Sequence, residues 1–254
     1  MTSEVSEQTE RANDLTVAVI LCAGQGARMR AGRNKVFLPL LGRPLIAYTL
    51  AAFEQATAVD EILLVAHPDE VAYFAREVIP DAGASKVSGV IAGGATRHQS
   101  EQSALEALRE RITESEFALV MIHDGARPLV TSAEIDQLAE VARAGVGAIL
   151  VTPVAASETL LETRSGGEIA LVEAPEELGR AQTPQAFDAR LLLAAYDQAR
   201  EDGFEGTDTA SALERLGYAI RGVEGSDENI KVTTPDDLLR AEAILRARQA
   251  SSPS

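Results

Sequence analysis

Positively charged side chains are concentrated in one short stretch of the chain that contains no acidic residue. Between Leu15 and Phe53 there is no Asp or Glu, whereas Arg28, Arg30, Arg33, Lys35 and Arg43 all lie there. The 254-residue chain has a formal net charge of −16, so this local positive surplus marks a candidate site for a small anion. Lysine is also rare in this chain, since only three of the 23 basic residues are lysines, and Lys35 is one of them.

A glycine-rich segment precedes Lys35. The apolar run Val17–Leu21 leads into residues 22–26, which read Cys-Ala-Gly-Gln-Gly. Small residues after a strand let the backbone approach a phosphate or a base, and Arg28 and Lys35 add charge. The segment is not a Walker A motif, and Met29 occupies the third glycine position of a dinucleotide fingerprint. A tight turn with solvated arginines is the alternative, but the acid-free window favours a phosphate site.

Two further polar loops follow apolar runs. Residues 93–100 either cap the next helix or contact a ribose or base. Residues 123–128 read His-Asp-Gly-Ala-Arg-Pro. Their carboxylate, Asp124, either forms a salt bridge within a turn or binds Mg²⁺, which prefers oxygen ligands.

Three segments in the second half of the chain have both structural and functional interpretations. Gln182–Phe187 reads as a turn that enters a helix, and Thr207–Ser211 reads as a helix cap. Asn229–Leu238 reads as a strand that leads into a helix started by proline, with Lys231 as its single lysine. A lysine in an apolar strand is unfavourable unless it meets an anion, so Lys231 is a candidate phosphate ligand.

Short apolar runs alternate with helical patterns, which predicts an α/β fold. The runs are continuous, as in strands that are buried on both faces of a parallel sheet. They are Val17–Leu21, Ile62–Ala66, Val87–Ile91, Leu119–Ile122 and Ala148–Val151. Helical patterns occupy 44–56, 69–78, 98–112, 133–144, 189–201, 208–216 and 236–248. This order predicts a doubly wound, mostly parallel sheet that binds ligands beyond the carboxyl ends of its strands.

One segment interrupts this alternation. Residues 153–182 are polar and contain Gly166–Gly167 between two short apolar stretches, which predicts a protruding β-hairpin arm. We expect a single domain over residues 15–249. The polar residues 1–14 and 250–254 are predicted to be flexible tails.

Composition excludes several classes of protein. The net negative charge argues against a general binder of nucleic acids or anionic membranes. Cys22 is the single cysteine, so an internal disulfide is impossible. No apolar run reaches the roughly 18–20 residues that a membrane span requires, and residues 1–10 lack the pattern of a signal peptide. We therefore expect a cytoplasmic protein without nucleic-acid or membrane partners.

The motifs together resemble those of a known enzyme family. Residues 21–29 and 35–45 are similar to the signature of the sugar-nucleotide pyrophosphorylase superfamily, whose glycine loop covers a nucleoside triphosphate. With residues 123–128, 182–187 and 229–238, the set resembles the cytidylyltransferases that make 4-diphosphocytidyl-2-C-methyl-D-erythritol for non-mevalonate isoprenoid biosynthesis. Their substrates are CTP and 2-C-methyl-D-erythritol 4-phosphate. A sister branch uses ribitol 5-phosphate. The resemblance extends over residues 17–240.

The resemblance implies a nucleotidyltransferase fold of the glycosyltransferase-A-like type and a role for each matching residue. The catalytic residues would be Arg28, Lys35 and Lys231. Arg28 and Lys35 would hold the triphosphate, and Lys231 would contact the α-phosphate. Asp124 would bind Mg²⁺ or another divalent cation. The family's arm crosses to a partner subunit, which implies a homodimer. The remaining implied substrate-binding residues are Cys22, Ala23, Gly24, Gly26, Gly94, Ser100, Gly125 and Thr207, with Thr159 supplied by the arm.

The chain departs from the family at two places on the acceptor side. No basic residue follows Thr159 closely. The arginine that the family carries about eight residues before its Thr-Pro-Gln motif aligns with Pro175. Arg180 is the nearest basic residue, and we expect it to bind the acceptor phosphate across the dimer interface.

The expected reaction is nucleotidyl transfer. A phosphate oxygen of the acceptor attacks the α-phosphorus of CTP, and pyrophosphate leaves. The acceptor phosphate is anionic at pH 7, so charge neutralisation and positioning suffice without a general base. Three alternatives stay open at this point: ribitol 5-phosphate as the acceptor, another triphosphate or a sugar 1-phosphate, and a non-catalytic nucleotide-binding regulator.

Overall fold

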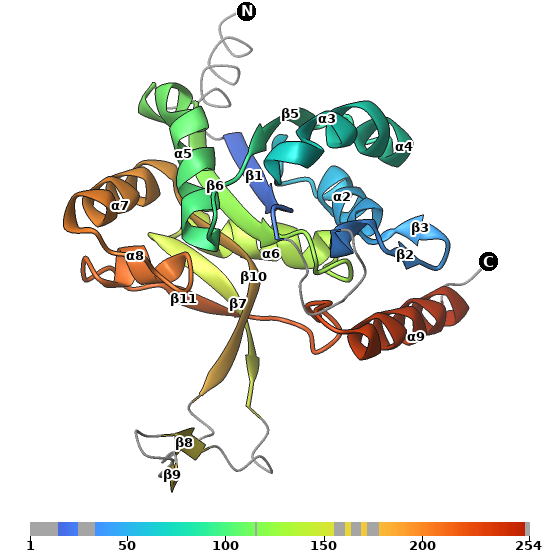
Figure 1. The fold of residues 1–254 in the computed structure, drawn as a ribbon. Helices are drawn as coiled ribbons and strands as arrows, with labels where there is room; N and C mark the ends of the chain where they lie inside the picture. Colours follow the sequence, from blue (N-terminus) through green and yellow to red (C-terminus); the bar gives the residue numbers. More distant parts are fainter. Residues whose placement is uncertain are drawn as a thin grey trace, which may run out of the picture.

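The apolar runs form the parallel part of one twisted sheet. The computed structural model describes residues 15–24, 34–114, 116–154, 161–163, 169–171 and 178–251. Among these, seven strands form one sheet in the order β11-β7-β10-β6-β1-β4-β5 (Figure 1). Every neighbouring pair is parallel except the two pairs that involve β10. The strands are β1 (Leu15–Leu21), β4 (Glu61–Ala66), β5 (Val87–Ala92), β6 (Phe117–Asp124), β7 (Gly147–Pro153), β10 (Gly179–Asp188) and β11 (Arg221–Glu224).

The strand order reverses at β1. The chain passes from β1 outward to β4 and β5, and β6 then lies on the opposite side of β1. Leu21 pairs with Asp124 at the carboxyl ends of β1 and β6. In an open α/β sheet such a reversal leaves a crevice at the carboxyl ends of the strands, where ligands bind.

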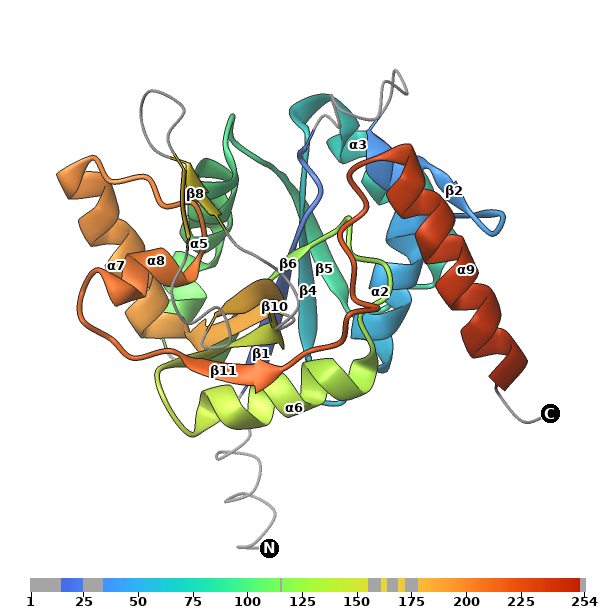
Figure 2. The same ribbon diagram turned by 90° about the horizontal axis from the view of Figure 1, so that it is seen from below.

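Helices cover both faces of the sheet, which explains the continuous apolar runs. Along β1, Ala18 and Ile20 pack into one buried cluster, and Val17 and Val19 pack into another. Successive side chains of a strand point to opposite faces, so a strand covered on both sides must be apolar throughout. On one face lie α2 (Leu45–Gln55) and α6 (Ser132–Arg143), and on the other lie α5 (Arg97–Thr113) and α7 (Ala189–Asp202) (Figures 1 and 2).

Short elements complete the described fold. α9 lies at one edge of the molecule, beside the β2–β3 hairpin (Figures 1 and 2). None of the helices in the part of the chain that the structure describes is long and apolar enough to cross a membrane. The short elements are η2 (Lys35–Phe37), β2 (Pro39–Leu40), β3 (Arg43–Pro44), η3 (Pro68–Glu70), α3 (Val71–Tyr73), η4 (Phe74–Val78), α4 (Ile79–Ala82) and α8 (Ala210–Glu214). The helix α9 (Pro235–Ser251) has 17 residues.

The predicted β-hairpin arm is confirmed. β7 and β10 extend beyond the body of the molecule, and a separate pair of strands lies past their ends (Figure 1). This pair consists of β8 (Leu161–Thr163) and β9 (Ile169–Leu171), which are antiparallel. The predicted turn at Gly166–Gly167 lies outside the described residues.

Three expectations about local structure were wrong. Gln182–Phe187 is the second half of β10 rather than a turn, and its side chains are buried. Asn229–Thr234 is irregular rather than a strand, since Val232 donates its N–H to the carbonyl of Ala126 instead of to a sheet neighbour (2.8 Å). The terminal helix continues to Ser251, so residues 250 and 251 are not a tail.

Candidate functional site

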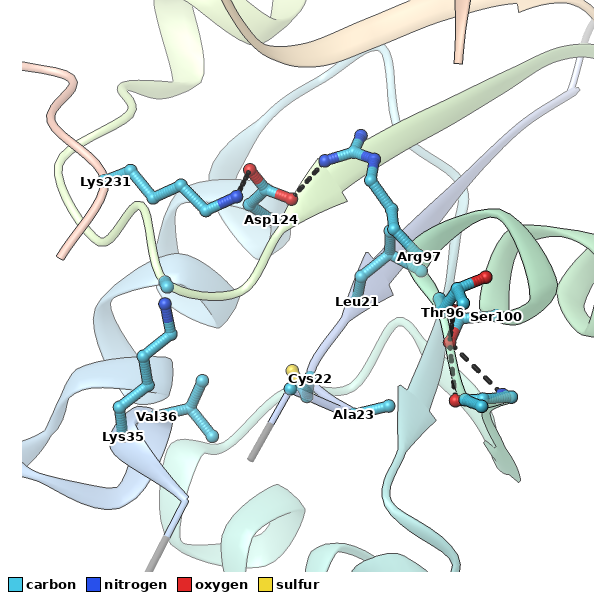
Figure 3. A pocket seen from close by; sticks show the side chains of 14 residues that line it. Leu21, Cys22, Ala23, Lys35, Val36, Thr96, Arg97, Ser100, Asp124 and Lys231 are labelled. Atoms are coloured by element: carbon cyan, nitrogen blue, oxygen red, sulfur yellow. Dashed lines mark hydrogen bonds and ion pairs between the residues drawn. The ribbon is translucent and has the colours of Figure 1, made fainter. Parts of the chain in front are cut away.

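A cationic cavity lies at the carboxyl ends of β1 and β6. It has a volume of about 190 Å³ and is lined by Lys35, Arg97, Asp124 and Lys231, together with small residues (Figure 3). Arg97 and Lys231 contact the carboxylate of Asp124, and Lys35 lines the same cavity. The cavity occupies the crevice that the strand reversal creates, where the sequence analysis expected the ligand.

The glycine-rich turn forms one wall of this cavity. Cys22, Ala23 and Gly24 line it as predicted, whereas Gly26 and Arg28 lie outside the described residues. A Cβ atom on Gly125 would lie 2.6 Å from the sulfur of Cys22, so only glycine allows the loop after β6 to approach this turn so closely. Burial raises the pKa of the Cys22 thiol, and Glu70 and Asp124 raise it further. Cys22 therefore stays neutral and shapes the wall rather than acting as a nucleophile.

Lys35 is held at the cavity by the residue before it. The buried side chain of Asn34 donates to the carbonyl of Cys22 (2.6 Å) and to Glu70 (2.7 Å), and it accepts from the backbone N–H of Val36. These bonds fix the start of η2 against the glycine-rich turn. The ammonium of Lys35 then points into the cavity (Figure 3). The sequence analysis missed Asn34, because a single Asn between two basic residues carries no recognisable pattern.

The start of α5 forms the opposite wall. Thr96 caps this helix by accepting the N–H of Gln99 (3.2 Å). The hydroxyl of Ser100 accepts the N–H of Gly94 (3.2 Å) and donates to the carbonyl of Thr96 (2.9 Å). Gly94 and Ser100 therefore both line the cavity, as predicted.

Asp124 lies at the centre of the charged groups. Its Oδ1 is 2.5 Å from Arg97 and its Oδ2 is 2.8 Å from Lys231 (Figure 3). Arg127 approaches it to 3.7 Å. Burial alone would raise the pKa of this carboxyl. The charges of Arg97, Lys231 and Arg127 outweigh burial and hold the pKa well below its usual range. Asp124 is therefore a carboxylate at neutral pH.

A buried histidine and threonine fix the backbone of Asp124. The N–H of Asp124 donates to the hydroxyl of Thr183 (3.0 Å), and this hydroxyl lies 3.2 Å from Nδ1 of His123. Nε2 of the same ring lies 3.2 Å from the carbonyl of Arg127. Burial lowers the pKa of His123 to about 3, so the ring is neutral and one tautomer satisfies all three contacts. His123 has a structural role here.

Thr183 also supports the segment that carries Lys231. The ladder between β10 and β7 shifts register between Ala181 and Gln185. Within this interruption, the carbonyl of Thr183 accepts from the side chain of Asn229 (3.0 Å), which is fully buried. Lys231 follows two residues later, next to Asp124.

Three predicted substrate-binding residues do not line the cavity, namely Gly125, Thr207 and Arg180. Thr207 is exposed, while Thr209 is fully buried and hydrogen-bonded to Arg97 (3.3 Å). Arg180 is exposed and donates to the carbonyl of Pro153 (3.3 Å). It lines a second cavity of about 530 Å³, and Lys231 lines both cavities. Thr159 lies outside the described residues.

The strand order and the cationic cavity at its reversal define a doubly wound α/β protein with a site for an anionic ligand. The family model for 2-C-methyl-D-erythritol 4-phosphate cytidylyltransferase matches residues 16–247. A cytidylyltransferase of that name from Halalkalibacterium halodurans is 44% identical over 232 residues, which cover 91% of this chain and 97% of the relative.

Solved structures give the same result. The enzyme of that name from Thermus thermophilus superposes with a TM-score of 0.70 at 33% identity, covering 90% of this chain and 98% of the other. The 4-diphosphocytidyl-2C-methyl-D-erythritol synthase from Anaerococcus prevotii gives a TM-score of 0.77 at 26% identity, covering 93% and 99%. The chain belongs to the 2-C-methyl-D-erythritol 4-phosphate cytidylyltransferase family, and it is a nucleotidyltransferase.

Proposed function

We propose that this chain joins CTP to 2-C-methyl-D-erythritol 4-phosphate, giving 4-diphosphocytidyl-2-C-methyl-D-erythritol and pyrophosphate in non-mevalonate isoprenoid biosynthesis. The family assignment supports this reaction. The observation that carries it is the cavity at the strand reversal, where Arg97 and Lys231 contact Asp124 and Lys35 lines the same space. The walls built from residues 22–24, Gly94 and Ser100 would contact the nucleotide.

The reaction exchanges one phosphate bond for another. A phosphate oxygen of the acceptor forms a bond to the α-phosphorus of CTP, and the bond from that phosphorus to the bridging β-phosphate oxygen breaks. The leaving pyrophosphate takes the electron pair. Lys231 would neutralise charge on the α-phosphate, and Lys35 and Arg28 would do so on the leaving group.

The residues present fit one divalent cation, which we propose to be Mg²⁺. Asp124 supplies an anionic oxygen, while no group of three or more acidic, histidine or cysteine side chains that could hold a metal occurs among the described residues. Mg²⁺ usually binds one or two carboxylates and takes its other ligands from waters and substrate phosphates. When bound, the ion would neutralise charge on the phosphates of CTP.

A substrate comparison tests the proposed function. We expect the purified chain to release pyrophosphate from CTP with Mg²⁺ and 2-C-methyl-D-erythritol 4-phosphate, and mass spectrometry should identify the cytidylylated product. Ribitol 5-phosphate and the other nucleoside triphosphates should react much more slowly. Preferential use of ribitol 5-phosphate would indicate that the chain is a ribitol 5-phosphate cytidylyltransferase instead. Binding of CTP without turnover on either acceptor would indicate a non-catalytic nucleotide-binding protein.

Arg180 is proposed to bind the acceptor phosphate. It lines the second cavity with Lys231, Arg127 and Arg240, which supports a phosphate contact at this cavity. Replacing Arg180 by alanine removes a charge-assisted hydrogen bond, so KM for the acceptor should rise about 10-fold while KM for CTP stays nearly unchanged. Steady-state kinetics with each substrate varied in turn measures both.

The control for this variant is Arg215→Ala, which removes an exposed arginine paired with Asp202 (2.6 Å). It should leave both KM values unchanged. If Arg180→Ala changes the two KM values equally, or changes neither, the acceptor phosphate binds elsewhere.

We also propose a cytoplasmic homodimer in which the arm contacts the second subunit. The β7–β10 extension and the β8–β9 pair support this arrangement, because they reach beyond the body of one chain (Figure 1). In that dimer Thr159 would contact the partner's acceptor.

A further inference from the structure

A buried carboxylate lies directly behind the charged cavity. Glu101 is on α5, four residues after Arg97, and only 1% of it is exposed. One oxygen accepts from Nε of Arg97 (2.8 Å) and from the hydroxyl of Thr209 (2.8 Å). The other accepts from the hydroxyl of Tyr196 on α7. The cavity itself does not include Glu101, so its carboxylate meets a ligand only through Arg97.

The guanidinium of Arg97 is held on three sides by this arrangement. Nε contacts Glu101, one terminal nitrogen donates to Thr209 (3.3 Å), and the other lies 2.5 Å from Asp124. Thr209 accepts from Arg97 and donates to Glu101, so both of its hydrogen-bonding roles are used. The ring of Tyr196 is itself stacked on His98, with the ring centroids 4.6 Å apart.

Packing alone does not account for a glutamate at this position. The neighbouring surfaces of α5 and α7 bury leucines and alanines, and an apolar residue at position 101 would complete that interface. Replacing a buried ion pair by well-packed apolar residues is often neutral or stabilising. A buried, fully hydrogen-bonded glutamate beside the site therefore points to a role in placing Arg97.

We propose that Glu101 is a positioning residue for nucleotidyl transfer. Held by Tyr196 and Thr209, it fixes the guanidinium of Arg97 and, through it, the carboxylate of Asp124. This inference rests on the proposed function. It adds residues behind the cavity to which the sequence motifs assign no role, although Thr209 lies within the segment Thr207–Ser211.

The need to fix Arg97 follows from the two close partners of Asp124, which are Arg97 and Lys231. Lys231 is the more exposed partner and lies on an irregular segment, and in the proposed reaction it turns to the α-phosphate. Arg97 then remains as the close partner that keeps Asp124 oriented. An arginine side chain has many rotamers, so it holds a carboxylate in one place only if its own position is fixed. Small misplacements of this kind slow a reaction that depends on alignment.

The decisive variant is Glu101→Gln, which keeps the shape and removes the charge. We expect kcat to fall about 10-fold while KM for CTP changes by less than about 3-fold, because alignment in the transition state is lost rather than ground-state binding. Tyr196→Phe keeps the ring and the charge of Glu101 but removes one hydrogen bond, so kcat should fall by a smaller factor.

A double-mutant cycle separates positioning from packing. In an Arg97→Gln background, Glu101→Gln should cause no further loss of kcat, because Glu101 acts through Arg97. The matched control is Asp197→Asn, which removes the partner of Arg109 (2.6 and 2.9 Å) from the outer side of the same pair of helices. Its kcat should match that of the unmodified chain.

Each result decides between the two roles. Unchanged kcat in a folded Glu101→Gln variant, or losses that multiply in the double variant, would overturn the proposal. If Glu101→Gln does not fold, an unchanged kcat in Tyr196→Phe overturns it. An inactive unmodified chain would instead contradict the proposed function, since the positioning role is measured relative to that chain.

Discussion

Replacing Lys35 by alanine is expected to reduce turnover by about 100-fold or more. Its ammonium points into the cavity, where it would neutralise the charge that builds on the leaving pyrophosphate (Figure 3). Removing one such preorganised donor typically raises the barrier by about 3–4 kcal/mol. Lys35→Arg should also be impaired, because a compact ammonium and a planar guanidinium are not equivalent. Pyrophosphate release at saturating CTP measures both variants.

The chain offers a matched control for Lys35. Lys86 donates to the carbonyl of Ala56 (2.7 Å) and does not line the cavity. Lys86→Ala should keep normal turnover even where it lowers the melting temperature. Near-normal turnover in the Lys35→Ala variant would show that Lys35 is not a catalytic residue.

Asp124→Asn is expected to abolish activity while the fold persists. The substitution keeps the shape of the side chain but removes the charge that lies between Arg97 and Lys231. Turnover should fall by about 100-fold or more, or should recover only at much higher Mg²⁺ concentration, because the one carboxylate of the proposed metal site is lost. Turnover against Mg²⁺ concentration, with thermal unfolding alongside, measures both effects.

The competing interpretation makes Asp124 a structural residue within a turn. Stability would then fall while activity per folded molecule survived, and the metal role would be excluded. Asp136→Asn provides the comparison. Asp136 lies on α6 and accepts hydrogen bonds from the N–H of Ala58 (2.8 Å) and the hydroxyl of Thr57 (3.0 Å), on the sheet face that α2 and α6 cover. That variant should lose stability and keep its activity.

The parallel half of the fold was predictable because its strands are buried on both faces. β1, β4 and the core of β6 appear in the sequence as continuous apolar runs, whereas the edge strand β5 has no buried residue and is marked only by Val87, Val90 and Ile91. β11 has four residues and only Val223 is buried, so no such run marks it. β10 is buried but polar between residues 182 and 185, because these side chains hydrogen-bond within the site instead of packing in the core.

The candidate site was predictable only where a residue belongs to a local motif. Lys35, Gly94, Ser100, Asp124 and Lys231 meet at one cavity as the motifs implied. The residues that hold them were missed, because their partners lie far away in sequence. Thr209, for example, bonds to residues about 110 positions earlier. No local pattern distinguishes it from the exposed Thr207.

Thr183 connects two groups that must keep a fixed separation. Its hydroxyl accepts from the backbone of Asp124, and its carbonyl accepts from Asn229 at the start of the Lys231 segment. The backbone segments of Asp124 and Lys231 are therefore both hydrogen-bonded to Thr183, although the two residues lie more than a hundred positions apart in the sequence. We expect a displacement of this part of β10 to move both backbone segments together. The distance between the two charged groups would then change mainly through the side chain of Lys231, when it turns from Asp124 to a phosphate.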